Sequence, residues 1–409
     1  MTSYLIKTPR LFDGISPALL DDAYVAVRDG VIVATGSQRQ LAPRPEGFDS
    51  IVDLPPDTTL LPGLINMHVH MTFSSGASIM DDHQRESSAT KVVRAVENLR
   101  AALRSGVTTV RDCGTVNEVA FAVRDAVEQG IFAGPRVFAA GAGITTTGGH
   151  CWWCGVEADD EPGVRRAVRS QVKAGADFIK VFATGGNSTP GTNSLDAQYT
   201  AVEMRAVTEE ARRLGRRVAS HALGVPGIRN SIEARVTTIE HCGFLLTGGP
   251  VYDTEMARRM AGEGIYVCPT LFTGVARHVG DDEVGLPEMT RAILEYRKAS
   301  FGIVAKLAQQ GVQLIAGNDA GVMDVGFADF PEDVGLAARH AGLSPVEAIK
   351  AATSRAAAAL GRDDLGVVSP GKVADLLAVR GNPLSDIAAL CAPVFVLARG
   401  RAVDIARAS

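Results

Sequence analysis

The run Leu61-Pro-Gly-Leu-Ile-Asn-Met-His-Val-His70 ends an apolar stretch with two histidines, two residues apart. In a β-strand, residues i and i+2 point to the same face of the sheet. His68 and His70 would therefore place two imidazoles side by side at the carboxyl end of a strand. Such a pair is half of a site for a divalent metal, so the other half must come from elsewhere in the chain.

The composition is that of an ordinary soluble globular protein, with 46% hydrophobic and 21% charged residues among 409. A net charge of −5 gives no reason to expect nucleic acid or an anionic membrane as a partner. No apolar run reaches the roughly 18 residues that span a bilayer. The first residues lack the basic start and apolar core of a signal peptide, so we expect a cytoplasmic location. Six cysteines in a chain of this length do not suggest a disulfide scaffold.

Both ends of the chain have the short alternating apolar pieces of β structure. Segments 23–27 and 30–34 read as a hairpin, and segments 373–379 and 393–398 have the same character. We therefore predict one small β-sandwich domain built from residues 1–60 and 362–409 together.

The middle of the chain, residues 61–361, alternates short apolar strands with helical segments. Val92, Val96, Leu99 and Leu103 share one face of an amphipathic helix. Further helices are expected over 203–214, over 226–234 and from Pro345, after the N-cap Ser344, through Leu360. The expected strands end near His70, Asp112, Gly143, Ala183, His221, His241, Thr270 and Asp319.

Eight strand–helix units over about 300 residues predict an α/β fold with a (β/α)8 barrel. A doubly wound open sheet is the alternative. No glycine-rich phosphate loop follows the first strand, which weakens that alternative.

In such a barrel, function lies at the carboxyl ends of the strands. The ionisable or metal-binding side chains expected there are His68, His70, Lys180, His221, His241 and Asp319. A single histidine at the end of a strand is more often structural than a metal ligand. A purely structural interpretation of all six residues, however, would require six independent coincidences. Four imidazoles and an aspartate suit zinc ions, although other divalent metals could bind.

Lys180 lies within Phe178-Ile-Lys-Val-Phe182, where burial of a lysine is costly unless its amine is used. A neutral lysine amine can add carbon dioxide and become a carbamate, which can bridge two metals. A Schiff-base lysine and a snorkelling lysine are the alternatives. Asp319 would be both a metal ligand and the general base, and its alternative role is a helix cap.

Other candidates lie near the same expected edge of the barrel. His150, which follows the third strand, is a predicted substrate contact. Cys151-Trp-Trp-Cys154 is expected to line the mouth of the pocket, rather than to act in redox chemistry or hold a structural zinc. His83, His278 and His340 are interpreted as surface or structural residues. The acidic runs Asp81-Asp82 and 281–283 are interpreted as solvated loop charges.

The motifs together resemble the amidohydrolase superfamily, in particular its imidazolonepropionase-like and prolidase-like (Xaa-Pro dipeptidase-like) subgroup of amide and peptide hydrolases. The resemblance covers essentially the whole chain. It rests on Pro62-Gly-Leu-Ile-Asn-Met-His-Val-His70, Ile179-Lys-Val-Phe-Ala-Thr-Gly-Gly186, His221, Glu240-His241, Gly317-Asn-Asp-Ala-Gly321 and Pro370-Gly-Lys-Val-Ala-Asp-Leu376.

The resemblance implies a barrel with a composite β domain and a site for two metals. His68, His70 and Asp319 match positions that hold the more buried metal, and His221 and His241 match the ligands of the second. Lys180 matches a carboxylated lysine that bridges both. Imidazolonepropionases use one metal and lack this lysine, so ring opening of an imidazolone is disfavoured here.

The chain also departs from the resemblance at two places. Many members of the subgroup carry a polar residue two positions after the histidine of the fifth strand, where this chain has Leu223. The Cys151-Trp-Trp-Cys154 insertion replaces a simpler glycine-rich version and suggests an aromatic wall of the pocket.

We therefore expect a binuclear zinc hydrolase that cleaves a C–N amide bond of a dipeptide or an N-acyl amino acid. A metal-bridging hydroxide would attack the carbonyl, one metal with His150 would stabilise the oxyanion, and Asp319 would pass a proton to the leaving amine. The alternatives are a mononuclear cyclic-amide or amidine hydrolase or deaminase, a lactone or ester hydrolase, a Schiff-base enzyme and a non-catalytic scaffold. The expected partner is a small-molecule amide; members of the superfamily are often homo-oligomers, which leaves that state open here.

Overall fold

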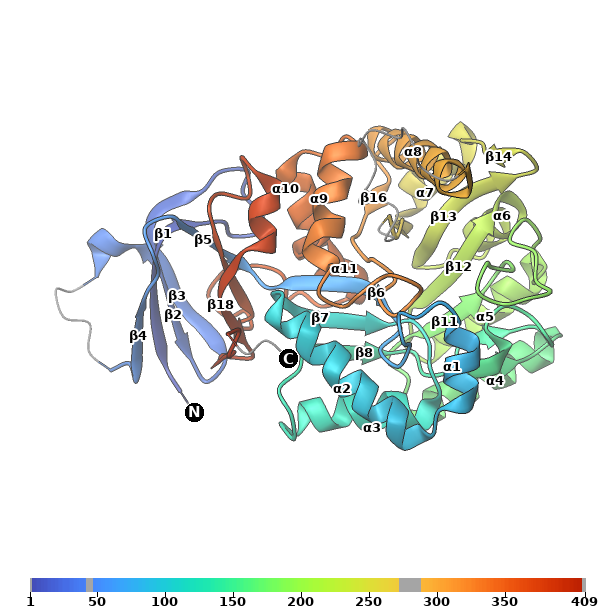
Figure 1. The fold of residues 1–409 in the computed structure, drawn as a ribbon, viewed down its shortest axis with the longest axis horizontal. Coiled ribbons are helices and arrows are strands. Elements are labelled where there is room, and N and C mark those ends of the chain that lie inside the picture. The colour runs from blue at the N-terminus through green and yellow to red at the C-terminus, as the bar shows by residue number, and fades with distance from the viewer. Residues whose placement is uncertain (1, 42–46, 272–287, 407–409) are drawn as a thin grey trace.

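The computed structural model describes residues 2–41, 47–271 and 288–406, which form a β-sheet unit beside a helix-covered barrel (Figure 1). The sheet unit has the strand order β19-β18-β17-β5-β1-β2-β3, with β4 paired to β1. Its strands are β1 (Tyr4–Leu11), β2 (Leu20–Arg28), β3 (Val31–Ser37), β4 (Ser50–Asp53), β5 (Thr58–Pro62), β17 (Leu376–Arg380), β18 (Pro393–Ala398) and β19 (Arg401–Ala402). Short 3₁₀ turns η1 (Gln38–Gln40) and η4 (Ile387–Cys391) accompany them.

Antiparallel pairing of β5 with β17 joins the two ends of the chain in this unit. Ile6, Val25, Leu60, Leu376 and Leu397 contribute to its buried apolar core. The predicted hairpin is β2–β3. The structure thus confirms that the two ends share a β domain, while the boundaries at 60/61 and 361/362 stay a prediction.

Eight strand positions form the barrel, and neighbouring strands run parallel. They are β6 (Leu64–Val69), β7 (Val107–Asp112), β8 (Arg136–Ala139), β11 (Ile179–Phe182), β12 (Val218–Gly224), β13 (Thr238–Leu246), β15 (Tyr266–Cys268) and β16 (Gln313–Leu314). The third position is split, because the chain leaves β8 at Ala139 and pairs with β11 only through β9 (Ile144–Thr145). The strand predicted to end near Gly143 is therefore two short strands. Two further short strands, β10 (Val156–Glu157) and β14 (Gly249–Pro250), lie beside β9 and β13.

The barrel closes where the segment after β16 runs beside β6. The amide of Asp319 donates to the carbonyl of His68 at 2.9 Å, and the amide of His70 donates to the carbonyl of Ala320 at 2.8 Å. Val69 and Ala320 form a parallel bridge between the same two segments. These bonds set Asp319 directly beside the two histidines of β6.

Helices cover the outside of the barrel (Figure 1). They are α1 (Ile79–Arg85), α2 (Ser88–Arg104), α3 (Asn117–Glu128), α4 (Glu161–Ala174), α5 (Ala201–Arg213), α6 (Val225–Glu233), α7 (Thr254–Glu263), α8 (Glu288–Gln309), α9 (Phe330–His340), α10 (Pro345–Ala351) and α11 (Ser354–Leu360), with the 3₁₀ turn η2 (Trp152–Cys154). The predicted α/β fold, a (β/α)8 barrel with a β-sandwich domain formed by both ends, is confirmed.

Two local predictions are wrong. The single helix expected from Pro345 through Leu360 is two helices, because Thr353 leaves the helical region with φ −139° and ψ −101°. Its hydroxyl donates to the carbonyl of Ile349 at 2.7 Å, a local bond that competes with helix continuation. Asp81 and Asp82 lie in the first turn of α1 rather than in a loop. His278 and the run 281–283 lie outside the described residues.

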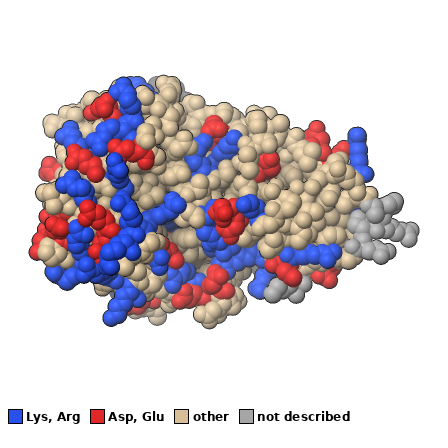
Figure 2. Space-filling view, turned by 180° about the vertical axis from the view of Figure 1, so that it is seen from behind, with Lys and Arg blue, Asp and Glu red and all other residues tan. Residues whose placement is uncertain are grey.

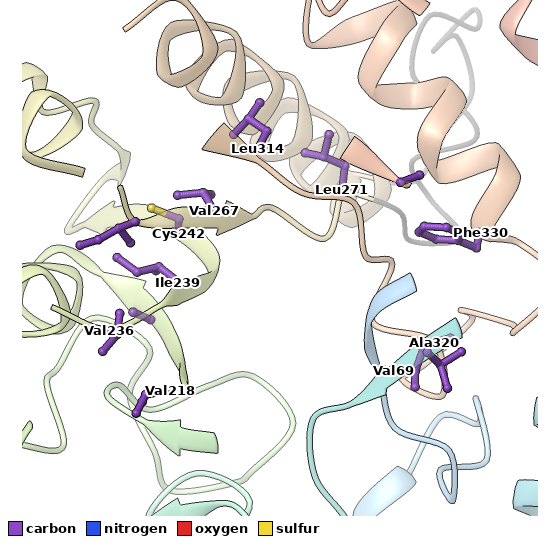
Figure 3. Packing of buried hydrophobic residues seen from close by; sticks show 14 of the residues in the cluster. Val69, Val218, Val236, Ile239, Cys242, Val267, Leu271, Leu314, Ala320 and Phe330 are labelled. Carbon is purple, nitrogen blue, oxygen red and sulfur yellow. The ribbon is translucent and has the colours of Figure 1, made fainter. Parts of the chain in front are cut away.

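Buried side chains of successive strands pack together in the barrel core. Figure 3 shows Val69, Val218, Ile239, Val267 and Leu314, which belong to β6, β12, β13, β15 and β16. Since side chains alternate along a strand, Val69 packs in this core while its neighbours His68 and His70 line a cavity. In β6, alternate side chains therefore serve the packing of the core and the lining of the cavity.

The surface charges and the apolar character of the helices bear on possible partners. On the face shown in Figure 2, Lys and Arg side chains are interspersed with Asp and Glu over the barrel. Among the helices of the described residues, none is long and apolar enough to cross a membrane.

Gly317 lies where the closing segment passes β6, and a larger residue should disturb that closure. A Cβ atom at this position would lie 2.6 Å from Sγ of Cys268 and 2.7 Å from the backbone nitrogen of His68. We expect Gly317→Ala to lower the thermal midpoint, with a destabilisation of about 1–3 kcal/mol from overpacking.

The matched control is Gly302→Ala, at an exposed position in α8 where a new Cβ atom would meet nothing within 4 Å. It should raise stability by up to about 1 kcal/mol, because alanine favours a helix over glycine. Equal midpoints for both variants would contradict the close approach at Gly317.

Candidate metal centre

The six predicted ligands and His150 line one cavity of about 480 Å³ at the carboxyl ends of the barrel strands. A cavity of this volume is in the usual range for a small-molecule site. The structure thus brings together residues from β6, β11, β12 and β13 and from the segment after β16. Their roles as ligands stay predictions.

Asp319 lies at the centre of the group. Its Oδ1 is 3.3 Å from Nε2 of His68 and 3.3 Å from Nε2 of His70. Ligand atoms of His68, His241 and Asp319 lie within 4.8 Å of one another. The rings of His221 and His241 have their centroids 4.6 Å apart, so the second pair of imidazoles adjoins the first. This donor set fits divalent metal ions such as zinc.

Each of the four imidazoles has one ring nitrogen engaged by an outer partner. The contacts are His68 Nδ1 to Glu240 at 2.8 Å, His70 Nδ1 to the carbonyl of Gly114 at 2.9 Å, His221 Nε2 to the carbonyl of Gly185 at 3.2 Å and His241 Nδ1 to Thr270 at 2.7 Å. The other ring nitrogen faces Oδ1 of Asp319 in His68 and His70, and in His221 and His241 no hydrogen bond to a described residue engages it. Metal-binding histidines are oriented by outer partners in this way.

Lys180 is 1% exposed, and its Nζ has no hydrogen-bond partner among the described residues. The nearest aromatic ring, that of Phe182, has its centroid 5.5 Å from Nζ. An ammonium group buried without a carboxylate is costly. A carbamate formed on this amine would change the cation to an anionic oxygen ligand, which fits a site surrounded by metal-binding groups.

The protonation states of His68, His221, His241 and Asp319 also fit metal binding, whereas at His70 burial is outweighed by the contact with Asp319, which raises the pKa. Burial lowers the pKa of His68 to about 4 and holds the pKa values of His221 and His241 well below the usual value. Burial alone would raise the pKa of Asp319, but the neighbouring imidazoles of His68 and His70 hold it well below its usual range. Neutral imidazoles and an ionised carboxylate are the forms that bind metals.

Glu240 and Arg111 form a buried ion pair behind His68. Glu240 is fully buried, and its Oε1 accepts from Nη2 of Arg111 at 2.6 Å while its Oε2 contacts His68. Arg111 also donates to the carbonyl of Met67 at 2.6 Å. Sequence reasoning gave neither residue a role. Both could have been noticed in the sequence, because each is a charged residue within an otherwise apolar strand.

The backbone is left-handed at several residues around the centre, two predicted ligands among them. His241, Thr270 and Asp319 have φ values of 67°, 45° and 60°. Residues with side chains adopt this region rarely, and such strain gathers at functional sites. In β13 the same irregularity lets two neighbours, Glu240 and His241, both serve the centre, which regular strand alternation would forbid.

The ring of Phe73 lines the cavity and stacks on His70 with ring centroids 4.5 Å apart. Of the segment Cys151-Trp-Trp-Cys154, which was predicted to line the mouth of the pocket, only Cys151 does so. Trp153 is not among the lining residues and packs against Phe73, with ring centroids 5.1 Å apart. His83 is 3% exposed and packs 4.9 Å from Trp153, so it is structural. Leu223 of β12 also lines the cavity.

His150 adjoins the second pair of imidazoles. Its ring centroid is 4.6 Å from that of His221, and its backbone amide donates to Oε1 of Gln198 at 2.6 Å. Its Nδ1 is buried and has no hydrogen-bond partner in the described part of the chain. His340 is remote from the cavity and packs on Phe301, with ring centroids 5.3 Å apart.

Comparison with known proteins gives related hydrolases. An ochratoxinase of Aspergillus niger is 28% identical, covering 90% of this chain and 79% of its own length. An imidazolonepropionase of Deinococcus deserti is 27% identical, covering 90% of this chain and 88% of its own. A crystal structure of a Xaa-Pro dipeptidase with bound methionine is 31% identical with a TM-score of 0.84, covering 98% of this chain and 100% of the other.

The amidohydrolase family matches residues 59–404, a range that contains every barrel strand and all of the candidate ligands. Members of this family are generally metal-dependent, in keeping with the donor set of the cavity. The chain therefore belongs to the amidohydrolase family and is a hydrolytic enzyme that acts on C–N bonds.

Proposed function

We propose that this chain is a binuclear zinc hydrolase that cleaves the C–N amide bond of a dipeptide or an N-acyl amino acid, with Lys180 carboxylated. The observation that carries the proposal is the buried Nζ of Lys180, which has no hydrogen-bond partner among the described residues and shares one cavity with four imidazoles that are each oriented by an outer partner. The kinship with a Xaa-Pro dipeptidase supports a peptide-like amide. A small molecule is accordingly the expected partner.

In this proposal, His68, His70 and Asp319 would hold one ion and His221 and His241 the other, and a carbamate on Lys180 would supply oxygen ligands to them. Two ions held there would activate a water molecule and polarise the carbonyl of the substrate. The remaining chemistry falls to the side chains of this chain.

In this proposal, Asp319 transfers the proton and His150 binds the carbonyl oxygen of the substrate. The carboxylate of Asp319 accepts a proton as the oxygen of water bonds to the carbonyl carbon, and it returns that proton to the amine nitrogen as the C–N bond breaks. The unpartnered Nδ1 of His150 can hydrogen-bond the carbonyl oxygen, where negative charge develops. Phe73, Phe182 and Leu223 line the cavity and exclude water from the reacting bond.

A substrate screen with elemental analysis tests the reaction and the metal count. Purified protein supplied with zinc and bicarbonate should hydrolyse members of a panel of dipeptides and N-acyl amino acids, and it should contain two metal ions per chain. Turnover of lactones with none of the amides would overturn the amide assignment. One ion at full activity would favour the mononuclear alternative.

Asp319→Asn should lower kcat by about 10³-fold, because an amide cannot shuttle the proton. Bound metal should fall less, since one oxygen remains as a donor. The control is Asp324→Asn, an exposed aspartate that also has a positive φ, of 61°, and it should stay near wild type. Steady-state kinetics and elemental analysis measure both. An Asp319→Asn enzyme with wild-type kcat would remove the proton-carrying role.

Lys180→Ala should lose metal and at least about 10²-fold in activity, because the bridging oxygens are gone. Short carboxylic acids added to the buffer should restore part of both, since a free carboxylate can occupy the vacated space. Lys173→Ala, at an exposed position in α4, is the control and should change neither. Two ions and full turnover in Lys180→Ala would refute the carbamate.

A further inference from the structure

Arg297 is a half-buried cation in the wall of the cavity that the proposed reaction does not use. It comes from α8, whose residues Tyr296, Ser300 and Ile303 also line the cavity. Its Nε is buried and has no hydrogen-bond partner among the described residues. The guanidinium carbon lies 5.6 Å from the centroid of the Tyr296 ring.

No direct ion pair to Arg297 is found among the residues that the structure describes, although Asp319 and Asp333 are near enough to favour its charged form. Burial acts most strongly and lowers the pKa of Arg297. A desolvated guanidinium is costly unless an anion pairs with it.

Among the described residues that line the cavity, Arg297 and Lys180 are the basic side chains, and Lys180 is a predicted ligand. Outside the predicted ligands, the charged lining residues of the described chain are therefore Asp81 and Arg297. Leu223 is apolar at the position where the resemblance would place a polar substrate contact. The remaining wall is mostly apolar and aromatic, and it suits an uncharged side chain of the substrate.

We propose that Arg297 binds the free carboxylate of the amino acid that leaves as the amine. This inference rests on the proposed function: it names the residue that recognises the carboxylate which every dipeptide and N-acyl amino acid carries on its amine half, and it favours substrates with an apolar side chain beside that carboxylate. Carboxylate is the anion whose planar shape matches the guanidinium fork with two parallel hydrogen bonds. Neutral amides lack the group that Arg297 would hold.

The kinetic test compares the amide turned over fastest in the screen with its analogue that lacks only the carboxylate. Wild-type protein should prefer the carboxylate form by about 10–100-fold in kcat/KM, the range for charge-assisted hydrogen bonds. Arg297→Met should abolish that preference mainly by raising KM, because the group binds ground state and transition state alike. Arg297→Lys should restore part of it, which a merely structural arginine would not show.

The matched control is Arg291→Met, at an exposed position in the same helix, and it should retain the full preference. Equal kcat/KM for both substrates in the wild type would overturn the inference. An Arg297→Met variant that loses activity equally on both substrates would overturn it as well.

A binding measurement separates failure of this inference from failure of the proposed reaction. Calorimetry with 3-phenylpropionate and 3-phenylpropan-1-ol needs no turnover. Arg297→Met should weaken binding of the acid by about 10–100-fold and leave binding of the alcohol unchanged. If no amide is hydrolysed but this loss occurs, the reaction is wrong and the carboxylate subsite stands. If amides are hydrolysed and the acid binds both proteins equally, the subsite is wrong and the reaction stands.

Discussion

The backbone hydrogen bonds between β6 and the segment after β16 are the constraint on which the centre depends. Because the amide of Asp319 donates to the carbonyl of His68, the backbone of Asp319 cannot move away from β6, which carries the two imidazoles, without opening the barrel. The left-handed backbone at Asp319 is held by the same closure. The same backbone hydrogen bonds therefore stabilise the barrel and position the residues of the site.

A second layer of contacts turns the cluster of imidazoles into an oriented set. Glu240 fixes the ring of His68 and is itself fixed by Arg111, so the orientation reaches back through two charged residues inside the barrel. Backbone carbonyls do the same for His70 and His221. A backbone carbonyl can orient an imidazole ring whatever side chain its residue carries. Contacts of this kind therefore cannot be recognised in the sequence.

The fold and the candidate ligands could be predicted because both follow from periodicity. Strand alternation placed His68 and His70 together, and parallel strands in a barrel must end at one edge. Glu240 was harder, because its role depends on the irregular backbone of β13, and regular alternation would turn it away from its neighbour His241.

Two other features could not be predicted from the apolar pattern, one because it depends on tertiary packing and the other because it depends on a single local hydrogen bond. Arg297 projects from a helix and not from a strand end, and the rotation of α8 relative to the cavity is set by tertiary packing. The break between α10 and α11 depends on one hydroxyl that bonds back to Ile349. Neither the composition nor the spacing of apolar residues predicts the position of Arg297 or the break between α10 and α11, because neither feature changes the apolar pattern.

The pairing of β5 with β17 has a consequence for biosynthesis. Pro62 and Leu376 are neighbours in the register of this sheet, yet roughly 300 residues of barrel are translated between them. At the usual pace of a ribosome, that interval lasts about 15–60 s. During it, one edge of β5 has no native partner, and an unpaired edge invites association with other chains. The nascent chain thus exposes this edge until its last strands emerge, and we expect its need for chaperones to be greatest in that interval.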